Sequence, residues 1–488
     1  MIDPNHGLLF IAGVLRESSS KARFNVLNPA DESIVGTVAD GTAEDVSEAV
    51  KAAREAFDTS SWSTGHAFRK QCLLQFQAGL RKEAAAFKAV QLAEAGICSS
   101  ISGLIDLTIE EMSYSIDLID TFAWETDYPA YEMLGMRSLR KVTYEPHGVV
   151  AAITAWNAPF MLNLWKIVPA LATGNTVILK GASETPLTAA LMGRIVKEYT
   201  DIPAGVFNVI SASKREIGGD GLTGDPRIDM FHFTGSTSVG QRIAERAANG
   251  IRKCVLELGG KSANVILPDA DLDFAIPHGV GMCMLNSGQG CTLATRMIVH
   301  ASLYDEAVER LAAMVVQVPV GDPARIETVV GPIINARQLA SIEGLVDRAR
   351  AAGARVVAGG HRLDRGGKGY WYAPTVVVDV DQDSELAQTE VFGPVLTVIR
   401  YEGDDEVAVR IGNNTQYGLS GYVQSRDVDR AWRVARRMRT GTVSINNSIH
   451  NSADTPFGGF GRSGLGREHG VEGWQEFLQS KTIASPAA

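Results

Sequence analysis

Three residues of this sequence pair a reactive or ionisable side chain with an unusual setting. Cys291 ends the run Asn-Ser-Gly-Gln-Gly-Cys, where small and polar neighbours leave its thiol approachable, so it is a candidate nucleophile. Glu257 ends an apolar run just before Leu-Gly-Gly, and buried carboxylates are rare without a partner or a chemical task. Asn157 places an amide directly after another apolar segment. The structural alternatives are an unreactive loop cysteine and two polar residues satisfied locally at strand ends.

Two glycine-rich patterns resemble nucleotide-binding motifs and are rejected. Gly459-x-Gly-x-x-Gly follows a proline-containing turn, where a dinucleotide-binding motif requires a strand. Gly260-Lys-Ser matches the end of a phosphate-binding loop, but the earlier glycine of such a loop falls on Val255. The nine histidines show no His-Glu-x-x-His or other metal-ligand spacing, so no metal site is predicted.

The segments that must position the three side chains alternate between strand and helix patterns from about residue 40 to residue 260. Thr42-Ala-Glu-Asp resembles a helix capping box, and the helical pattern over 186–199 begins with proline, which favours a first turn. This alternation predicts a doubly wound parallel sheet that binds ligands at the carboxyl ends of its strands. Strands are predicted over 149–154, 176–179, 206–210, 230–233 and 254–258. The second half is less regular, with a helix expected over 339–352 and strands over 355–357 and 376–380.

Composition and charge exclude several classes of function. The 488 residues are 45% hydrophobic and 21% charged, as in a globular protein of two or three domains. A net charge of −10 without a basic block argues against nucleic acid and membrane-surface partners. The uncharged segment 148–165 is read as a buried strand that runs into a turn, because its Thr, Asn and Pro residues suit a membrane span poorly. Met1–Gly7 shows no secretory signal, and five scattered cysteines favour a reducing, cytoplasmic location.

Eight sequence blocks, in order and with fitting spacing, resemble the aldehyde dehydrogenase superfamily over nearly the whole chain. The separation between Glu257 and Cys291 is the one that the family uses. The blocks are 156–159 with 165–166, 174–180, 233–240, 256–261, 286–296, 390–394, 413–419 and 456–468.

The resemblance implies an α/β fold with three parts. A doubly wound parallel-sheet cofactor-binding domain would comprise residues 1–123 and 147–258, and an α/β catalytic domain residues 259–460. A small β bridging element, residues 124–146 and 461–488, would add strands to the sheet edge of a neighbouring subunit. A homodimer or homotetramer is therefore expected.

The same resemblance implies catalytic roles. Cys291 would attack an aldehyde, and Asn157 with the backbone N–H of Cys291 would hold the oxyanion. After hydride transfer, Glu257 would draw a proton from the water that hydrolyses the thioester to a carboxylic acid. A coenzyme-A-acylating enzyme is a rival, but it has no need of the base Glu257. A non-enzymatic relative is another, and it would have no need to retain all three residues.

For the cofactor, NAD or NADP, the resemblance implies a further set of residues. Lys180 would contact the adenosine ribose, and Ser236, after Gly235, the pyrophosphate at a helix N-terminus. Glu390 would bind the nicotinamide ribose beside Phe392, with Gln338 as a weaker ribose contact. Trp156 and Ser183 complete the cofactor-binding candidates. Lys261, Arg296 and Asn413 are expected to hold loops together, and the glycines of 458–466 to shape a turn near the active site.

The chain departs from the family pattern at positions that bear on specificity. Ser183 occupies the place of a common glutamate that would repel the 2′-phosphate of NADP, although Glu184 follows it directly. The loop 447–454 is polar where relatives often carry a large apolar residue, so a more polar substrate mouth is expected. Its apolar walls would be Leu162, Trp165 and Leu285. The substrate is a small aldehyde whose identity the sequence does not specify.

Overall fold

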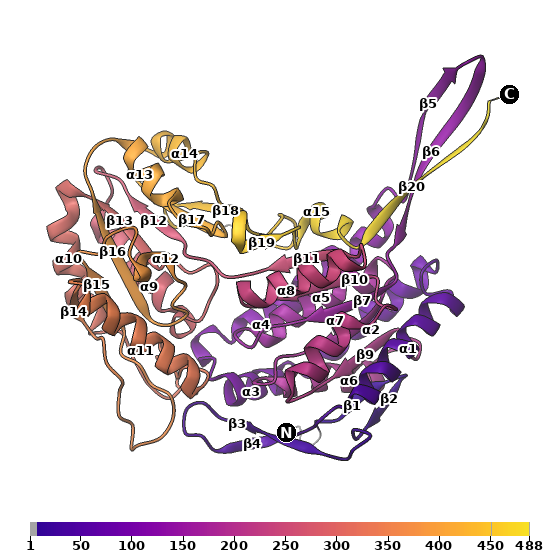
Figure 1. Cartoon of the computed structure of the whole chain (residues 1–488), viewed down its shortest axis with the longest axis horizontal. Helices are drawn as coiled ribbons and strands as arrows, with labels where there is room; N and C mark the ends of the chain where they lie inside the picture. The colour runs from indigo at the N-terminus through magenta and orange to yellow at the C-terminus, as the bar shows by residue number, and fades with distance from the viewer. Residues whose placement is uncertain (1–6, 450, 488) are drawn as a thin grey trace.

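Two helix-covered β-sheets lie side by side in the computed structural model, and a three-stranded β arm projects from one of them (Figure 1). The structure describes residues 7–449 and 451–487. Most of Met1–Gly7, where no secretory signal is predicted, therefore lies outside the described residues. The doubly wound α/β architecture predicted from the sequence is confirmed.

The first sheet has eight strands in the order β19-β11-β10-β7-β8-β9-β1-β2. Its five central strands are parallel and nearly all buried, which explains their continuous apolar sequences. Each of the five strands predicted in this region is present within one or two residues. The bounds are β1 (Leu9–Ile11), β2 (Val14–Arg16), β7 (Val149–Ile153), β8 (Thr176–Lys180), β9 (Phe207–Ile210), β10 (Met230–Thr234), β11 (Lys253–Glu257) and β19 (Gly464–Leu465).

Helices cover both faces of this sheet. The capping box at Thr42 and Asp45 is present at the start of α1, and α6 begins at Pro186 as predicted. The bounds are α1 (Ala43–Thr59), α2 (His66–Lys82), α3 (Ala84–Ala95), α4 (Gly103–Thr121), α5 (Pro159–Ala172), α6 (Pro186–Tyr199), α7 (Gly221–Gly224), α8 (Thr237–Asn249) and α15 (Gly470–Gln475). Strands β3 (Arg23–Leu27) and β4 (Ile34–Ala39) form a separate hairpin.

The second sheet has seven strands in the order β14-β15-β16-β13-β12-β17-β18, all parallel to their neighbours except β14. The sequence predicts only β14, β15 and α11 of this unit. The strands are β12 (Ala263–Ile266), β13 (Arg296–His300), β14 (Arg355–Ala358), β15 (Thr375–Val378), β16 (Val395–Tyr401), β17 (Ser420–Gln424) and β18 (Thr442–Ile445). The helices are α9 (Leu272–Met284), α10 (Ala301–Val315), α11 (Ala336–Ala351), α12 (Glu385–Gln388), α13 (Asp405–Asn413) and α14 (Val428–Ala435).

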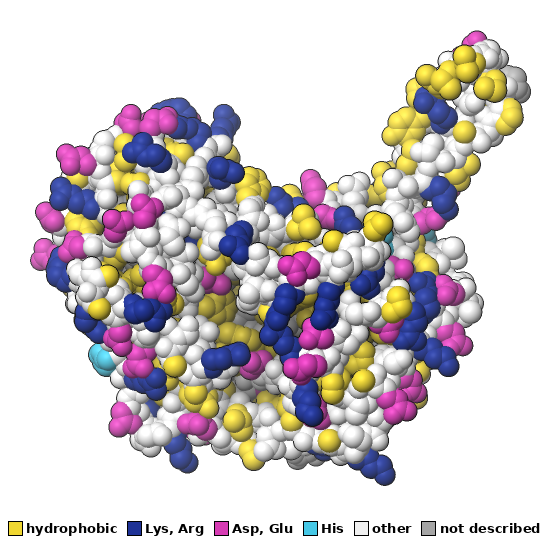
Figure 2. Space-filling view, in the orientation of Figure 1, with side chains coloured by type: hydrophobic (Ala, Val, Ile, Leu, Met, Phe, Trp, Pro, Cys, Tyr) yellow, Lys and Arg dark blue, Asp and Glu magenta, His cyan; other side chains and the backbone are white. Residues whose placement is uncertain are grey.

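The arm consists of β5 (Glu125–Met133), β6 (Met136–Pro146) and β20 (Leu478–Pro486), all antiparallel. Figure 2 shows hydrophobic side chains gathered along it. They include Tyr128, Tyr131, Met133, Leu134, Met136, Leu139 and Ile483, which are half or more exposed. The sequence groups residues 461–488 with the arm, but β19 pairs with β11 and Trp474 packs in the core of the first unit. Only β20 of that segment joins the arm.

The uncharged segment 148–165 contains β7, a short connection and the first turns of α5. The strand is as predicted, whereas the helix that starts at Pro159 is not. Among the residues that the structure describes, no helix combines the length and apolarity of a membrane span.

Candidate active site

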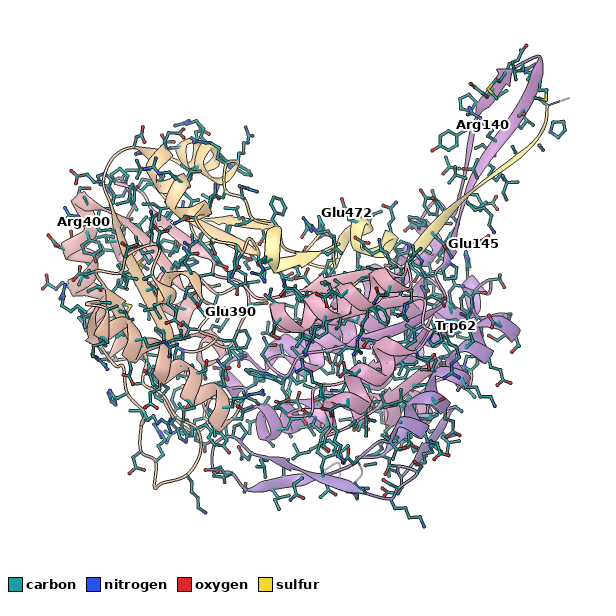
Figure 3. All side chains as sticks on the ribbon, in the orientation of Figure 1. Trp62, Arg140, Glu145, Glu390, Arg400 and Glu472 are labelled. Carbon is teal, nitrogen blue, oxygen red and sulfur yellow. The ribbon has the colours of Figure 1, made fainter. Side chains whose placement is uncertain are left out.

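A cavity of about 1130 Å³ lies where the carboxyl ends of β7, β8, β10 and β11 face the second unit. Figure 3 places Glu390 at this junction, between the two units. All eleven residues predicted for the site line the cavity. They are Asn157, Glu257 and Cys291, and the cofactor candidates Trp156, Lys180, Ser183, Gly235, Ser236, Gln338, Glu390 and Phe392. One cavity therefore brings together residues from segments far apart in the sequence.

Cys291 follows a loop with an unusual backbone. Asn286, Ser287 and Gly288 all have positive φ angles of 50°, 58° and 72°, a conformation that side chains disfavour. A Cβ at Gly288 would overlap the backbone of Gly393, and one at Gly260 would overlap the carbonyl oxygen of Cys291. Glycines on both sides thus let the loop pack closely enough to fix the position of the cysteine.

Cys291 is partly exposed as a residue, and its thiol is difficult to ionise. Among the five cysteines, all of them described, only Cys291 is not classed as buried. Its low-dielectric surroundings raise the pKa of the Cys291 thiol, and the carboxylates of Glu257 and Glu390 raise it further. Without substrate, the sulfur is therefore held mainly as a thiol.

Asn157 is tied to the loop that carries the cysteine. Its Nδ2 donates to the carbonyl oxygen of Gln289 at 3.0 Å, and Asn286 Nδ2 donates to the carbonyl oxygen of Asn157 at 2.8 Å. These two hydrogen bonds fix the end of β7 relative to the Cys291 loop. The amide of Asn157 is thereby held at the wall of the cavity that also contains the thiol.

Glu257, the last residue of β11, is only 3% exposed, and neither carboxylate oxygen has a hydrogen-bond partner among the described residues. Burial raises the pKa of Glu257 well above its usual value, and the nearby charge of Glu468 adds to this effect. A Cβ at Gly458 would lie 2.8 Å from Glu257 Oε1, so the predicted glycine turn packs directly on the carboxylate.

Lys166 and Glu468, whose charges both act on Glu257, form a buried ion pair. Lys166 Nζ is 2.5 Å from Glu468 Oε1, and both side chains are at most 1% exposed. His232 Nδ1 lies 3.5 Å from the same oxygen, and burial lowers the pKa of His232 well below its usual value, so this imidazole is neutral. Lys166 therefore provides the positive charge that balances Glu468.

Lys180 is the last residue of β8, and Ser183 lies in the connection from β8 to α6; both line the cavity. Burial lowers the pKa of the Lys180 ammonium, an effect that Glu184 opposes and Arg215 increases. Ser183 Oγ donates to Glu184 Oε2 at 3.0 Å, and the guanidinium of Arg337 lies 3.8 Å from the other oxygen of that carboxylate. The part of the cavity beside α6 therefore offers a ligand a hydroxyl, a carboxylate and cationic groups.

Ser236 is the N-cap residue of α8, as the sequence predicts for a helix that opens after Thr-Gly. The N–H of Gly235 donates to the carbonyl oxygen of Glu257 at 3.0 Å, which links this turn to the strand of the candidate base. The free N–H groups and partial positive charge of a helix N-terminus attract anions such as phosphates.

Glu390 and Phe392 lie on the opposite wall. Glu390 Oε1 accepts a hydrogen bond from the N–H of Gly260 at 2.8 Å, and burial raises the pKa of Glu390 to about 7. Phe392 has a positive φ of 54° and packs edge-on against Trp156, with ring centroids 5.2 Å apart. Gln338 Nε2 donates to the carbonyl oxygens of Val391 and Phe392 at 2.9 and 3.0 Å, so it also braces this loop.

The residues expected to hold loops together differ in what they do. Arg296 donates to four backbone carbonyl oxygens, at Lys261, Ile411, Gly412 and Asn414. Asn413 bonds the backbone of Arg437 and Arg439. The Lys261 ammonium, in contrast, has no hydrogen-bond partner among the described residues, so it does not brace a loop.

The sequence missed one wall of the cavity. Ile97, Ile101, Leu104 and Ile105, from the end of α3 to the start of α4, line it together with the predicted Leu162, Trp165 and Leu285. These apolar residues are separated by serines and a glycine and extend into α4, so they give no periodic signal that separates a cavity wall from ordinary core. Of the polar loop 447–454, only Asn451 among its described residues lines the cavity, so the mouth is more apolar than expected.

The fold and the arrangement of the candidate catalytic and cofactor-binding residues are those of one enzyme class. The chain belongs to the aldehyde dehydrogenase family, whose sequence profile matches residues 15–483. It is therefore an oxidoreductase that acts on aldehydes.

Individual relatives cover almost the full length of the chain. A 3-succinoylsemialdehyde-pyridine dehydrogenase of Pseudomonas sp. is 38% identical over 94% of this chain and 94% of its own. A mutant of aldehyde dehydrogenase C from Pseudomonas syringae, solved with NAD+ and octanal, is 36% identical at a TM-score of 0.92, with 99% of this chain and 98% of that chain covered. Betaine aldehyde dehydrogenase from Staphylococcus aureus, solved with NAD+, is 33% identical at a TM-score of 0.94, with coverage of 98% and 94%.

Proposed function

We propose that this protein oxidises an aldehyde to a carboxylic acid with NAD+ or NADP+ through a covalent intermediate on Cys291. The observation that carries the proposal is that Cys291, Glu257 and Asn157 line one cavity although they come from three distant segments. The hydrogen bonds of Asn157 to the Cys291 loop support roles for both in one reaction.

Each catalytic residue has one task. The Cys291 thiol gives its proton to solvent water, and the resulting thiolate attacks the aldehyde carbon to form a thiohemiacetal, while the Asn157 amide and the Cys291 backbone N–H stabilise the oxyanion. A cofactor held beside Trp156 and Phe392 would supply the hydride acceptor that allows the thiohemiacetal to become a thioester. Glu257, whose raised pKa makes its carboxylate a stronger base, removes a proton from water. The resulting hydroxide attacks the thioester, releases the acid and frees the sulfur.

The residues at the other end of the cavity fit a dinucleotide. The α8 N-terminus at Ser236, after Gly235, suits the pyrophosphate, and the Lys180 ammonium suits ribose hydroxyls. Glu390 suits the hydroxyls of the second ribose, with Gln338 nearby, and the packed pair Trp156 and Phe392 suits the nicotinamide ring. Ser183 carries no charge that would repel a 2′-phosphate.

The domain division and assembly expected from the sequence remain part of the proposal. Residues 1–123 and 147–258 would bind the cofactor, and 259–460 would carry the nucleophile. The arm, with its exposed apolar side chains, would pair with a neighbouring subunit in a homodimer or homotetramer. A cytoplasmic location is proposed because a reactive thiol and four other free cysteines suit a reducing compartment.

The direct test is Cys291→Ala, assayed by absorbance of the reduced cofactor with a panel of aldehydes. Oxidation should be abolished, while cofactor binding measured by fluorescence quenching stays close to that of wild type. Cys254→Ala, at a buried cysteine in β11, is the matched control and should remain active. More than about a tenth of wild-type turnover in Cys291→Ala would remove Cys291 as the nucleophile.

A further inference from the structure

The end of the cavity beyond the catalytic residues has mostly apolar walls, and the polar residues Gln91 and Asn451, which also line the cavity, carry no charge. The walls come from the α3–α4 connection, from α5 and from the loops that carry Leu285 and Phe457, and Figure 1 shows α4 and α5 next to one another. The apolar residues are Ile97, Ile101, Leu104, Ile105, Phe160, Met161, Leu162, Trp165, Leu285, Leu293 and Phe457.

The charged groups of the cavity are segregated from this end. Most come from the segments after β8, β9 and β10 and from α11, where the cofactor residues lie: Lys180, Glu184, Arg215, Asp220, Arg242, Arg246 and Arg337. Glu390 lies on the wall of the nicotinamide candidates. The remaining carboxylates are Glu257, which is the candidate base, and Glu468, which Lys166 neutralises at 2.5 Å.

The aromatic rings at this end are engaged with one another and do not form an open cage. The Trp165 ring packs edge-on against His469 at 4.3 Å and lies 5.6 Å from Phe457. Phe160 is fully buried and packs against Phe87 at 4.7 Å. Among the described residues that line this end, a cation would find no free carboxylate to replace its hydration, and an anion would find no arginine or lysine.

We propose that the substrate is an uncharged aldehyde whose body is an aliphatic chain or an aromatic ring, and that this apolar end rejects aldehydes with a charged group. The inference rests on the proposed function and extends it to a substrate class. The walls bury apolar substrate surface favourably, whereas a fixed charge of either sign would be desolvated without compensation.

Two pairs of aldehydes that differ mainly in charge test the proposal. Betaine aldehyde and 3,3-dimethylbutanal have nearly the same shape, but only the first is a cation. 4-Oxobutanoate and its methyl ester differ by one negative charge. In steady-state assays of the wild-type enzyme, kcat/KM should be at least about 10²-fold higher for the neutral member of each pair. A ratio within about threefold in either pair would overturn the substrate class, while oxidation of that pair would still support the proposed function.

A variant that adds a charge gives a second test. Leu104 in α4 lines the cavity and is 42% exposed, so Leu104→Arg should place a cation at the mouth without a buried cavity defect. The preference for the methyl ester over 4-oxobutanoate should fall about tenfold or more. Leu107→Arg is the control, because Leu107 lies on the same helix, is 53% exposed and does not line the cavity.

The outcomes distinguish a failure of the proposed substrate class from a failure of the proposed function. An unchanged preference in Leu104→Arg, or an equal change in Leu107→Arg, would contradict the assignment of this end to the substrate. If none of the four aldehydes, octanal or benzaldehyde is oxidised with either cofactor, the proposed function itself fails.

Discussion

Replacing Glu257 by glutamine should separate the two halves of the proposed reaction. The substitution keeps the shape of the side chain and removes its ability to take a proton. Acylation of Cys291 does not use this base, so one equivalent of reduced cofactor should still form rapidly. Hydrolysis of the thioester should then become rate-limiting.

The size of the loss follows from what surrounds the carboxylate. Removal of a positioned general base lowers a rate by about 10²–10⁴-fold, which is roughly 2.7–5.5 kcal/mol. Among the described residues, the other candidate bases are engaged or enclosed: Glu468 is paired with Lys166 at 2.5 Å, Glu390 accepts a hydrogen bond from the N–H of Gly260, and His232 is fully buried. Steady-state turnover should therefore fall by at least 10²-fold.

Glu257→Gln should also change the thiol. The negative charge of Glu257 contributes to the raised pKa of Cys291. A neutral glutamine removes this repulsion, so the pKa should fall and the pH profile of thiol alkylation should move to lower pH. This shift reports that the charge of Glu257 lies near the thiol, whereas steady-state turnover reports its role as the base.

The assays are stopped-flow absorbance of the reduced cofactor, pH-dependent alkylation with iodoacetamide, and thermal unfolding. The unfolding temperature should not fall, because the substitution removes a buried carboxylate that lies near a like charge. Wild-type steady-state turnover in the folded variant would refute the assignment of Glu257 as the deacylation base. Loss of the burst would show that Glu257 acts before the thioester forms.

Three further predictions concern other parts of the site. Asn157→Ala should slow the acylation burst by about 10²–10³-fold, and an unchanged burst rate would remove it as an oxyanion donor. The wild-type enzyme should use NADP within about tenfold of NAD in kcat/KM, and Ser183→Glu should depress NADP use selectively. A wild-type preference for NAD beyond a hundredfold contradicts this role of Ser183. Lys166→Met should destabilise the protein by about 3–5 kcal/mol in urea unfolding because Glu468 loses its partner, and a second change, Glu468→Leu, should restore much of the loss.

Much of the first unit could be predicted because its local signals agree with its fold. The five central strands are apolar runs bounded by turn residues, and the helices between them carry clear starts at Thr42 and Pro186. Ser236 caps α8 as expected, but that expectation came from the family resemblance and not from a local pattern. The grouping of the site residues also depended on the family resemblance, since no local pattern relates Asn157 to Cys291.

The features that the sequence did not reveal arise from long-range contacts. Strands β12 and β17 have four and five residues, and a helix pattern or a loop explains such short runs equally well. The Lys166–Glu468 pair joins residues 302 positions apart, so neither residue signals the other. The apolar wall of Ile97 to Ile105 becomes a wall only because α4 packs beside α5.

The route of the chain between the two sheets has a consequence for synthesis on the ribosome. The chain leaves the first sheet at Glu257 and returns at Gly464, and these two residues are register partners on β11 and β19. The whole second unit is therefore an excursion whose two ends meet. A nascent chain can complete that unit, with its thiol, before the edge strand β19 and Glu468 have been made. The surroundings of Glu257 are then assembled last, so a chain truncated before residue 464 would hold a nucleophile without a finished site for the base.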